Sequence, residues 1–218
     1  MKILVVEDQT IVRELLMRAC AEAVAGAQMR GAGTGKAALA ECRREPPDLV
    51  MLDLVLPDGD GLELLGDVFA AAPAAKVIVL SSHIDEFTLS RAFKSRVHGI
   101  IDKNEQPVRI LGEAIATVLG GGQYVSSTVA QLRASLRADP SAFDKILTDR
   151  EQEVLQLIGR GVSNEGVAEA LGISVSTARH HRINIMEKLD IHSTPQLIRY
   201  AIEKGFSRVN LRTDRGAN

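Results

Sequence analysis

Acidic and basic side chains follow short apolar runs in the first half of the chain, where they could handle phosphate. Glu7-Asp8 follows the run ILVV, Asp53 lies in DLVMLDL, and Asp102-Lys103 ends the run GIID. Packing the carboxylates of Glu7, Asp8 and Asp53 together is costly unless a cation joins them, and oxygen ligands of this kind suit Mg²⁺. A carboxylate beside Mg²⁺ can attack a phosphoryl donor and become an aspartyl phosphate.

Lysine and serine side chains complete this set. Transfer depends on positioning and on neutralising charge at the phosphoryl oxygens. Lys103 can pair with one of these oxygens, and the hydroxyl of Ser81, near the end of KVIVLSS, can donate to another. A hydrolase built from Ser81 or Ser82, His83 and Asp53 is an alternative, but no G-x-S-x-G elbow exposes the nucleophile. We therefore favour phosphoryl chemistry at Asp53.

The glycine-rich stretch GAGTGKAAL, from Gly31, is a second candidate for phosphate binding. A P-loop needs glycine at position 30 and a hydroxyl at position 37, where this chain has Arg30 and Ala37. The dinucleotide fingerprint fails as well, because Lys36 stands where its last glycine belongs. We interpret these glycines as a mobile strand-to-helix turn.

Alternating strand and helix patterns must position these residues. The predicted strands are 3–6, 27–32, 48–54, 76–82 and 99–102, and the predicted helices are 10–24, 35–44, 61–70, 85–96 and 106–119. Regular βα units predict a doubly wound α/β fold with a five-stranded parallel sheet. The carboxyl ends of parallel strands share one edge, so the residues that follow them are expected to converge.

Residues 1–120 resemble a known family. The matching elements are Glu7-Asp8, the stretch DLVLPDGDG at 53–61, Ser81 and Lys103, which resemble the receiver domain of two-component response regulators in order, spacing and strand context. The resemblance implies a flavodoxin-like fold. It also implies that a sensor histidine kinase phosphorylates Asp53, the first residue of this stretch.

The same resemblance implies a magnesium site. Its ligands would be Glu7, Asp8, Asp53 and the backbone carbonyl of Val55. Receivers usually carry an aromatic residue three positions before the lysine, where this chain has Ile100. The aromatic switch of the family is therefore in doubt here, although the chemistry is not affected.

The second half of the chain has helical patterns and no strand pattern. The predicted divisions are a receiver domain at 1–121, a linker at 122–145 with a short helix at 128–137, a helical domain at 146–210 and a C-terminal tail at 211–218. Thr148 and Glu151 form a capping box, and Ser163 and Ser174 open two further helices around Gly172. A helix, a short glycine-containing turn and a second helix form a helix-turn-helix arrangement.

Residues 147–206 resemble the LuxR-type helix-turn-helix of NarL/FixJ response regulators, a small all-α domain. The resemblance implies that the helix at 176–189 enters the major groove, where Arg179 and His180 face base edges and Ile183 offers an apolar contact. The residues implied to approach phosphates are Ser174, Thr177, His181, Arg182 and Lys188.

Composition agrees with two tasks. Residues 1–121 carry 13 Lys+Arg against 17 Asp+Glu, a net charge of −4, whereas residues 122–218 carry 13 against 11, a net charge of +2. Two cysteines suit a reducing compartment. The chain shows no signal peptide and no membrane-spanning run, so we expect a cytoplasmic protein without membrane contact.

We therefore expect a transcription regulator that binds double-stranded DNA under the control of Asp53 phosphorylation. We expect no enzymatic activity apart from catalysis of its own phosphorylation and dephosphorylation. One helical domain covers one half-site, so we expect a homodimer in the active state. The alternative is a phosphorelay or protein-interaction module whose helical domain does not read DNA. Whether phosphorylation promotes receiver dimers or frees the DNA-contacting helix from the receiver stays open.

Overall fold

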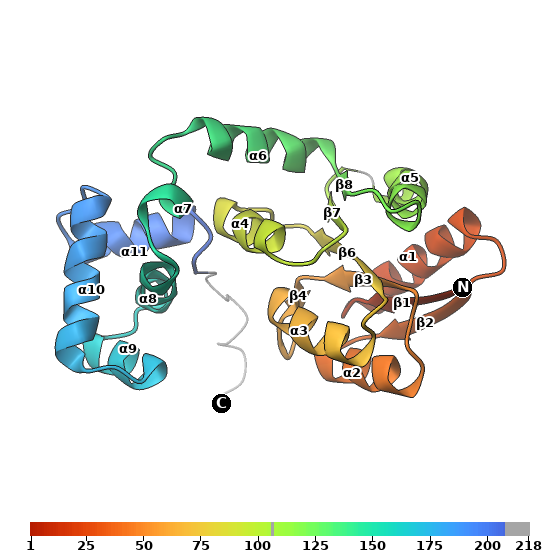
Figure 1. Ribbon diagram of the computed structural model, residues 1–218, viewed down its shortest axis with the longest axis horizontal. Helices are drawn as coiled ribbons and strands as arrows, with labels where there is room; N and C mark the ends of the chain where they lie inside the picture. Colours follow the sequence, from red (N-terminus) through yellow and green to blue (C-terminus); the bar gives the residue numbers. More distant parts are fainter. Residues whose placement is uncertain (106, 208–218) are drawn as a thin grey trace, which may run out of the picture. The chain divides into compact units, whose positions relative to one another are not determined.

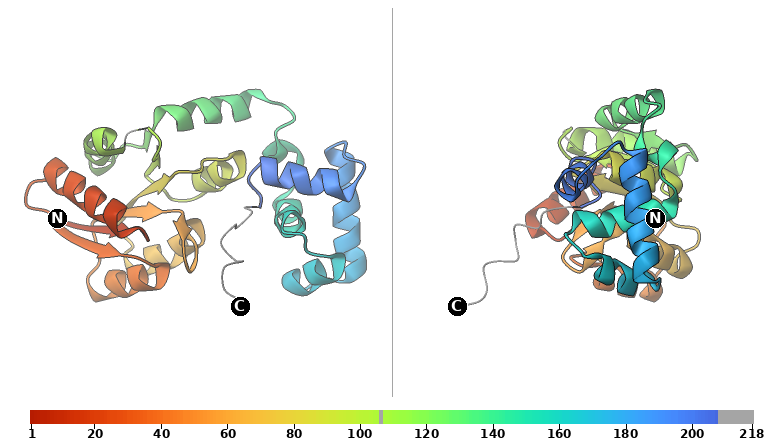
Figure 2. Two further views of the ribbon diagram at one scale, coloured as in Figure 1. Left: turned by 180° about the vertical axis from the view of Figure 1, so that it is seen from behind. Right: turned by 90° about the vertical axis from the view of Figure 1, so that its left-hand side faces the viewer.

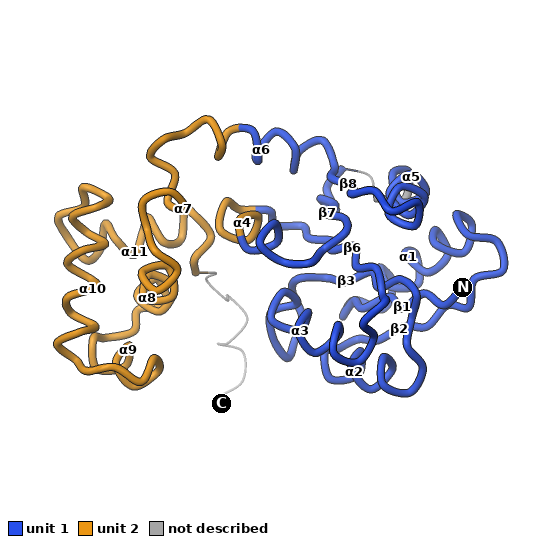
Figure 3. The backbone as a smooth tube through the Cα atoms, viewed as in Figure 1, with its two compact units in different colours: residues 1–84, 91–134 blue, residues 85–90, 135–218 orange. Residues whose placement is uncertain are grey.

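The computed structural model describes residues 1–105 and 107–207 of the chain, which form two compact units (Figure 3). Unit 1 contains residues 1–84 and 91–134, and unit 2 contains residues 85–90 and those from 135 onward. The predicted tail at 211–218 lies outside the described residues, as does the end of the predicted DNA-binding domain at 208–210. Within the described part of the chain, no helix is long and apolar enough to cross a bilayer.

Unit 1 is built around one parallel sheet, with strand order β2-β1-β3-β6-β7-β8 (Figure 1). Its strands are β1 (Lys2–Val6), β2 (Gln28–Ala32), β3 (Leu49–Asp53), β6 (Lys76–Ser81), β7 (Gly99–Asp102) and β8 (Tyr124–Val125). The central strands are buried on both faces, which explains their nearly continuous apolar sequences. The predicted α/β fold and its five strands are therefore confirmed.

Helices cover both faces of this sheet (Figure 2). They are α1 (Thr10–Ala23), α2 (Gly35–Arg44), α3 (Gly61–Ala71) and α5 (Pro107–Leu119), while the residues of α4 (Glu86–Lys94) are divided between the two units. Helices α1 and α5 pack together on one face, where Leu16 and Leu111 join Ile3 and Ile78 in the core. Helices α2 and α3 pack against each other on the opposite face.

A sixth strand, β8, extends the sheet beyond the five predicted strands. It falls in the stretch predicted as a linker, and its two residues pair in parallel with β7, Tyr124 with Gly99 and Val125 with Ile100. A strand of two residues is too short to show a period, so the sequence carried no signal for it. Ile100, at the position of the family's aromatic switch, is only 2% exposed in this arrangement.

Helix α6 (Ser127–Ala138) follows β8 and confirms the predicted short helix in this region. One carboxylate, that of Glu105, holds its first turn. It accepts hydrogen bonds from the Ser127 and Thr128 amides at 3.0 and 2.6 Å, and from the hydroxyls of Ser126 and Ser127 at 2.8 and 2.5 Å. Burial alone would raise the pKa of Glu105, but these hydrogen bonds outweigh it and lower the pKa from 4.5 to about 2.

The contact predicts that Glu105→Ala loosens the start of α6. Losing a helix cap costs about 1 kcal/mol, so the amides of residues 127–130 are expected to exchange about fivefold faster, as measured by hydrogen-exchange mass spectrometry. Because the folded pKa is depressed, the contribution of Glu105 is present above pH 4.5 and lost as the pH falls toward 2. Glu113→Ala, at an exposed position on α5, is the control. Equal exchange in both variants would contradict the assignment.

Unit 2 is helical from α7 to α11. Its helices are α7 (Phe143–Ile146), α8 (Asp149–Gly159), α9 (Asn164–Leu171), α10 (Val175–Lys188) and α11 (Thr194–Glu203). Helix α8 packs against α10 and α11, and α9 packs against α10. Three phenylalanines, Phe87, Phe143 and Phe206, pack together within its core, with ring centroids 4.1 to 6.1 Å apart.

The ends of these helices follow the predicted local chemistry. Thr148 and Glu151 make both hydrogen bonds of a capping box at the start of α8. The hydroxyls of Ser163 and Ser174 accept amide hydrogen bonds at the starts of α9 and α10. Gly172, between those helices, has a φ of 63°, a left-handed backbone conformation that residues other than glycine rarely adopt. The helix-turn-helix geometry is thus fixed by local sequence.

Candidate functional site

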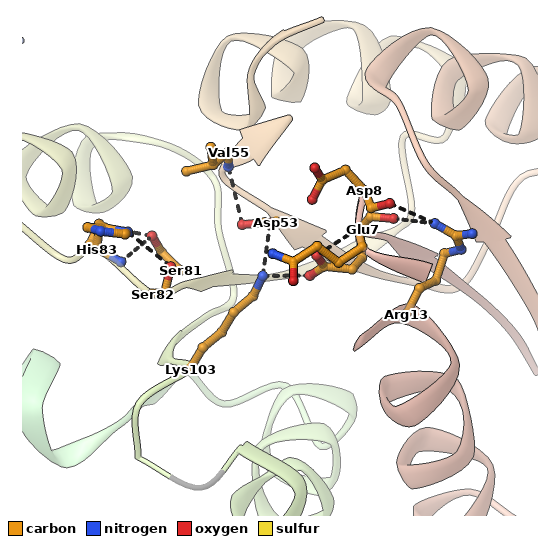
Figure 4. A network of polar contacts seen from close by, with 10 residues as sticks. Glu7, Asp8, Arg13, Asp53, Val55, Ser81, Ser82, His83 and Lys103 are labelled. Atoms are coloured by element: carbon orange, nitrogen blue, oxygen red, sulfur yellow. Dashed lines mark hydrogen bonds and ion pairs between the residues drawn. The ribbon is translucent and has the colours of Figure 1, made fainter. Parts of the chain in front are cut away.

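Three carboxylates converge at the carboxyl edge of the sheet in unit 1 (Figure 4). Glu7 and Asp8 follow β1, and Asp53 ends β3, the strand that pairs with β1. Each offers an oxygen, and these oxygens lie within 4.8 Å of one another. We call Glu7, Asp8 and Asp53 the acidic pocket. Its convergence follows from parallel pairing, as the sequence predicted.

Lys103 neutralises part of this charge. Its Nζ lies 2.5 Å from Oε2 of Glu7 and 2.8 Å from Oδ2 of Asp53, and its side chain is only 14% exposed. Glu7 is fully buried, and this burial raises the pKa of its carboxyl although the Lys103 hydrogen bond opposes the shift. The ammonium therefore bridges two carboxylates of the acidic pocket.

Ser81 is placed at the same edge, but its hydroxyl is engaged elsewhere. The hydroxyl donates to the His83 carbonyl at 2.9 Å and accepts from the His83 amide at 3.1 Å. The Ser82 hydroxyl lies 3.0 Å from Nδ1 of His83. Asp53 is bonded to Lys103 and to the Val55 amide, the latter at 3.2 Å, so it does not orient His83 as a hydrolase triad would require.

The glycine turn before α2 is occupied by the protein itself. The Gly35 and Lys36 amides donate to the two carboxylate oxygens of Asp58 at 2.8 and 2.9 Å. These hydrogen bonds lower the pKa of Asp58. A phosphate at this helix start would need the same amides, so the arrangement agrees with the rejection of a P-loop.

The loop from Asp53 to α3 brings close backbone contacts to the pocket. It contains a hairpin of β4 (Val55–Leu56) and β5 (Gly59–Asp60). A Cβ added to Gly61, the first residue of α3, would lie 2.4 Å from the Asp53 carbonyl oxygen. Glycine is therefore needed where the helix passes the strand that carries Asp53.

In unit 2, helix α10 presents the residues predicted to contact DNA. Those exposed to solvent are Ser174, Thr177, Arg179, His180, Ile183 and Lys188, whereas His181 and Arg182 are half-buried. Ala178 and Ile185 point into the core. Arg179, His180 and Ile183 therefore share an outward face at helical spacing.

Two basic side chains among the predicted phosphate contacts have partners elsewhere in the domain. Lys188 bonds the buried carboxylate of Glu151 at 2.8 Å, and the guanidinium of Arg182 donates to the Val162 carbonyl at 3.3 Å. Burial would raise the pKa of Glu151, but hydrogen bonds from Lys188 and Thr148 outweigh it and lower the pKa. Lys188 thus stabilises the domain in addition to any contact with DNA.

Sequence reasoning missed Arg13, which supports the pocket, and Asp58, which holds the turn before α2. Arg13 donates from Nη1 to the Glu7 carbonyl at 2.6 Å and to the Asp8 carbonyl at 3.5 Å. Its sequence signal is an arginine in the first turn of the helix that follows an acidic pair, with glycines at the end of the neighbouring strand. Asp58 had no such signal, because its partners are backbone amides 22 and 23 residues away.

Comparisons with known proteins agree with both units. The model of the response regulator receiver domain matches residues 3–115, and that of the luxR family of bacterial regulatory proteins matches residues 145–201. The chain is 32% identical to the oxygen regulatory protein NreC of Staphylococcus haemolyticus, over 94% of this chain and 98% of that protein. It is 29% identical to the response regulator VraR of Staphylococcus aureus, over 93% and 96%.

A solved structure extends this agreement to the whole fold. RcsB of Salmonella enterica serovar Typhimurium, bound to promoter P1flhDC in the presence of the phosphomimetic BeF3−, has a TM-score of 0.65 at 25% identity. The alignment covers 92% of this chain and 97% of that chain. Fold and pocket together define a receiver joined to a LuxR-type DNA-binding domain. The chain belongs to the response regulators, in the NarL/FixJ arrangement.

Proposed function

We propose that Asp53 is the phosphoacceptor of this response regulator and that its phosphorylation controls DNA binding by unit 2. The observation that carries the proposal is the acidic pocket, with Lys103 bonded to Glu7 and Asp53. A sensor histidine kinase is the expected donor, because the chain belongs to a family that receives phosphoryl groups. We also propose a cytoplasmic location, because the proposed partner of unit 2 is DNA.

In the transfer step, an Oδ atom of Asp53 forms a bond to phosphorus while the bond from phosphorus to the donor nitrogen breaks. The nitrogen keeps the electron pair of that bond. The Lys103 ammonium, which lies 2.8 Å from Oδ2 of Asp53, then pairs with an oxygen of the phosphoryl group instead. Ser81 reaches another oxygen once its hydroxyl leaves the His83 carbonyl.

The acidic pocket also fits Mg²⁺. Three carboxylate oxygens within 4.8 Å of one another match the preference of this ion for oxygen ligands, and the Val55 carbonyl is the proposed fourth contact. When bound, the ion neutralises charge on the carboxylates and on the phosphoryl group. Glu7, Asp8 and Asp53 would hold it.

For unit 2, we propose that α10 enters the major groove, with Arg179 and His180 at base edges and Ile183 at an apolar contact. The outward face that these residues share supports this role. Ser174, Thr177, His181, Arg182 and Lys188 are the proposed phosphate contacts. Arg182 and Lys188 can serve only where their present partners leave a donor free.

Arg179 and Lys188 are expected to behave differently when each is replaced by alanine. Arg179→Ala removes an exposed side chain, so it should cost about 1–3 kcal/mol of binding, relax specificity at one base pair and leave the melting temperature unchanged. Lys188→Ala leaves Glu151 buried without its cation, so it should also destabilise unit 2 by about 1–2 kcal/mol. Fluorescence anisotropy and thermal unfolding separate the two effects. An unchanged melting temperature for Lys188→Ala would contradict the structural role.

The proposed function is tested by DNA binding of the full chain before and after treatment with acetyl phosphate. Genomic fragments are selected with the phosphorylated chain, and affinities are measured by anisotropy at fixed salt. Phosphorylation should tighten binding about tenfold, through a homodimer that sedimentation velocity detects. If no fragment is enriched over random DNA, the alternative of a phosphorelay or protein-interaction module is favoured. If phosphorylation leaves the affinity for DNA unchanged, the proposed control by Asp53 is wrong.

A further inference from the structure

One basic side chain of helix α1, that of Arg13, contacts the backbone of the acidic pocket. Arg13 donates from Nη1 to the carbonyl oxygens of Glu7, at 2.6 Å, and Asp8, at 3.5 Å (Figure 4). Its Nη2 donates to the Thr10 hydroxyl at 3.3 Å. The guanidinium thus bonds the backbone of both residues that the pocket takes from the end of β1, while their carboxylates stay free to converge on Asp53.

The glycine turn makes room for this side chain. A Cβ at Gly31 would lie 3.1 Å from Cδ of Arg13, and a Cβ at Gly33 would lie 3.3 Å from its Nη1. Both distances are tighter than ordinary contacts. Two of the three glycines in the stretch GAGTGKAAL, Gly31 and Gly33, therefore lie where an added side chain would contact Arg13 too closely.

Electrostatics alone would argue against an arginine here. A fixed positive charge close to a cation site opposes cation binding. The geometry offers a compensating effect, because the planar guanidinium forms hydrogen bonds with two successive carbonyls and so restricts the backbone that carries two metal ligands. Partners of this kind, which hold ligands without touching the metal, commonly change metal affinity by 10–100-fold when removed.

We propose that Arg13 is a positioning residue: by holding the carbonyls of Glu7 and Asp8, it keeps their carboxylates convergent with Asp53 and ready for Mg²⁺. The proposal rests on the proposed function of the acidic pocket. It extends that function by assigning a role to a residue outside the pocket and to the turn formed by Gly31 and Gly33.

The test is Mg²⁺ binding by the unphosphorylated full chain, measured by isothermal titration calorimetry and checked with Mn²⁺ by electron paramagnetic resonance. Arg13→Gln should raise the Kd about tenfold, with the melting temperature in metal-free buffer little changed. Arg18→Gln is the matched control, since Arg18 is exposed on the same helix and loses the same charge. It should leave the Kd unchanged or slightly lower.

The direction of the change in the Kd for Mg²⁺ shows whether Arg13 acts by positioning the ligands or through its charge. Equal or tighter Mg²⁺ binding by Arg13→Gln would overturn the proposal, and so would equal weakening by Arg18→Gln. Arg13→Lys keeps the charge and should recover part of the affinity, because one ammonium can bond one carbonyl. If Arg13→Gln fails to fold, Arg13→Lys decides: a wild-type Kd would overturn the proposal, and a weaker Kd would support it.

A second variant tests the role of the turn. Gly33→Ala should weaken Mg²⁺ binding in the wild-type background and have no further effect in the Arg13→Gln background, because both changes disturb the same contact. Additive effects would overturn the assigned link between Gly33 and Arg13. If the wild-type chain binds no Mg²⁺, the proposed function of the pocket fails, and this outcome is distinct from a failure of the inference.

Discussion

Incubated with Mg²⁺ and acetyl phosphate, the Asp53→Asn protein gains no phosphoryl group, whereas the wild-type chain gains one. The change keeps the size of the side chain but removes the nucleophilic oxygen, which lies in a pocket with Glu7, Asp8 and Lys103. An amide cannot form the acyl phosphate, so labelling at this position should be lost completely. Intact-protein mass spectrometry measures the result directly.

A matched control and a graded variant make this result specific. Asp67→Asn makes the same change on an exposed turn of α3 and should be labelled like the wild type. Asp8→Asn leaves the nucleophile but weakens the proposed magnesium site, so labelling should be slow and need more Mg²⁺. Full labelling of Asp53→Asn would show that another residue accepts the group and would remove the basis for the proposed function.

The position of the pocket was predictable because the backbone determines it. Parallel strands align their carboxyl ends, so Glu7, Asp8, Asp53 and Lys103 had to meet once the strands were recognised from their apolar runs. The direction of individual side chains was not predictable in the same way. The Ser81 hydroxyl donates a hydrogen bond to the nearby His83 carbonyl. This contact depends on the rotamer of one side chain, which no pattern in the sequence reports.

Long-range pairings explain most of what sequence reasoning missed. Glu105 caps a helix that begins 22 residues later, and Lys188 bonds a carboxylate 37 residues earlier. Each depends on where two elements meet in space, which periodicity within one element does not report. The capping box of Thr148 and Glu151 was predicted correctly because both partners lie within one turn.

The two glycines of α3 provide the last prediction, because the same substitution should have opposite effects at the two positions. Gly61→Ala would place a Cβ 2.4 Å from the Asp53 carbonyl oxygen and 2.9 Å from Cα of Leu54. Both neighbours are backbone atoms, so the helix and the loop must shift. We expect a loss of about 3 kcal/mol in the free energy of unfolding of unit 1.

At Gly66, on the exposed side of the same helix, an added Cβ meets no other atom within 4 Å. Gly66→Ala should therefore stabilise unit 1 by about 1 kcal/mol, because alanine favours the helix. Native-state hydrogen exchange of β1 and β3 peptides measures both changes. Gly61→Ala should also slow labelling by acetyl phosphate, since the shift displaces Asp53, whereas Gly66→Ala should not. If both variants were equally stable, the close approach of α3 to Asp53 would not be a constraint on the site.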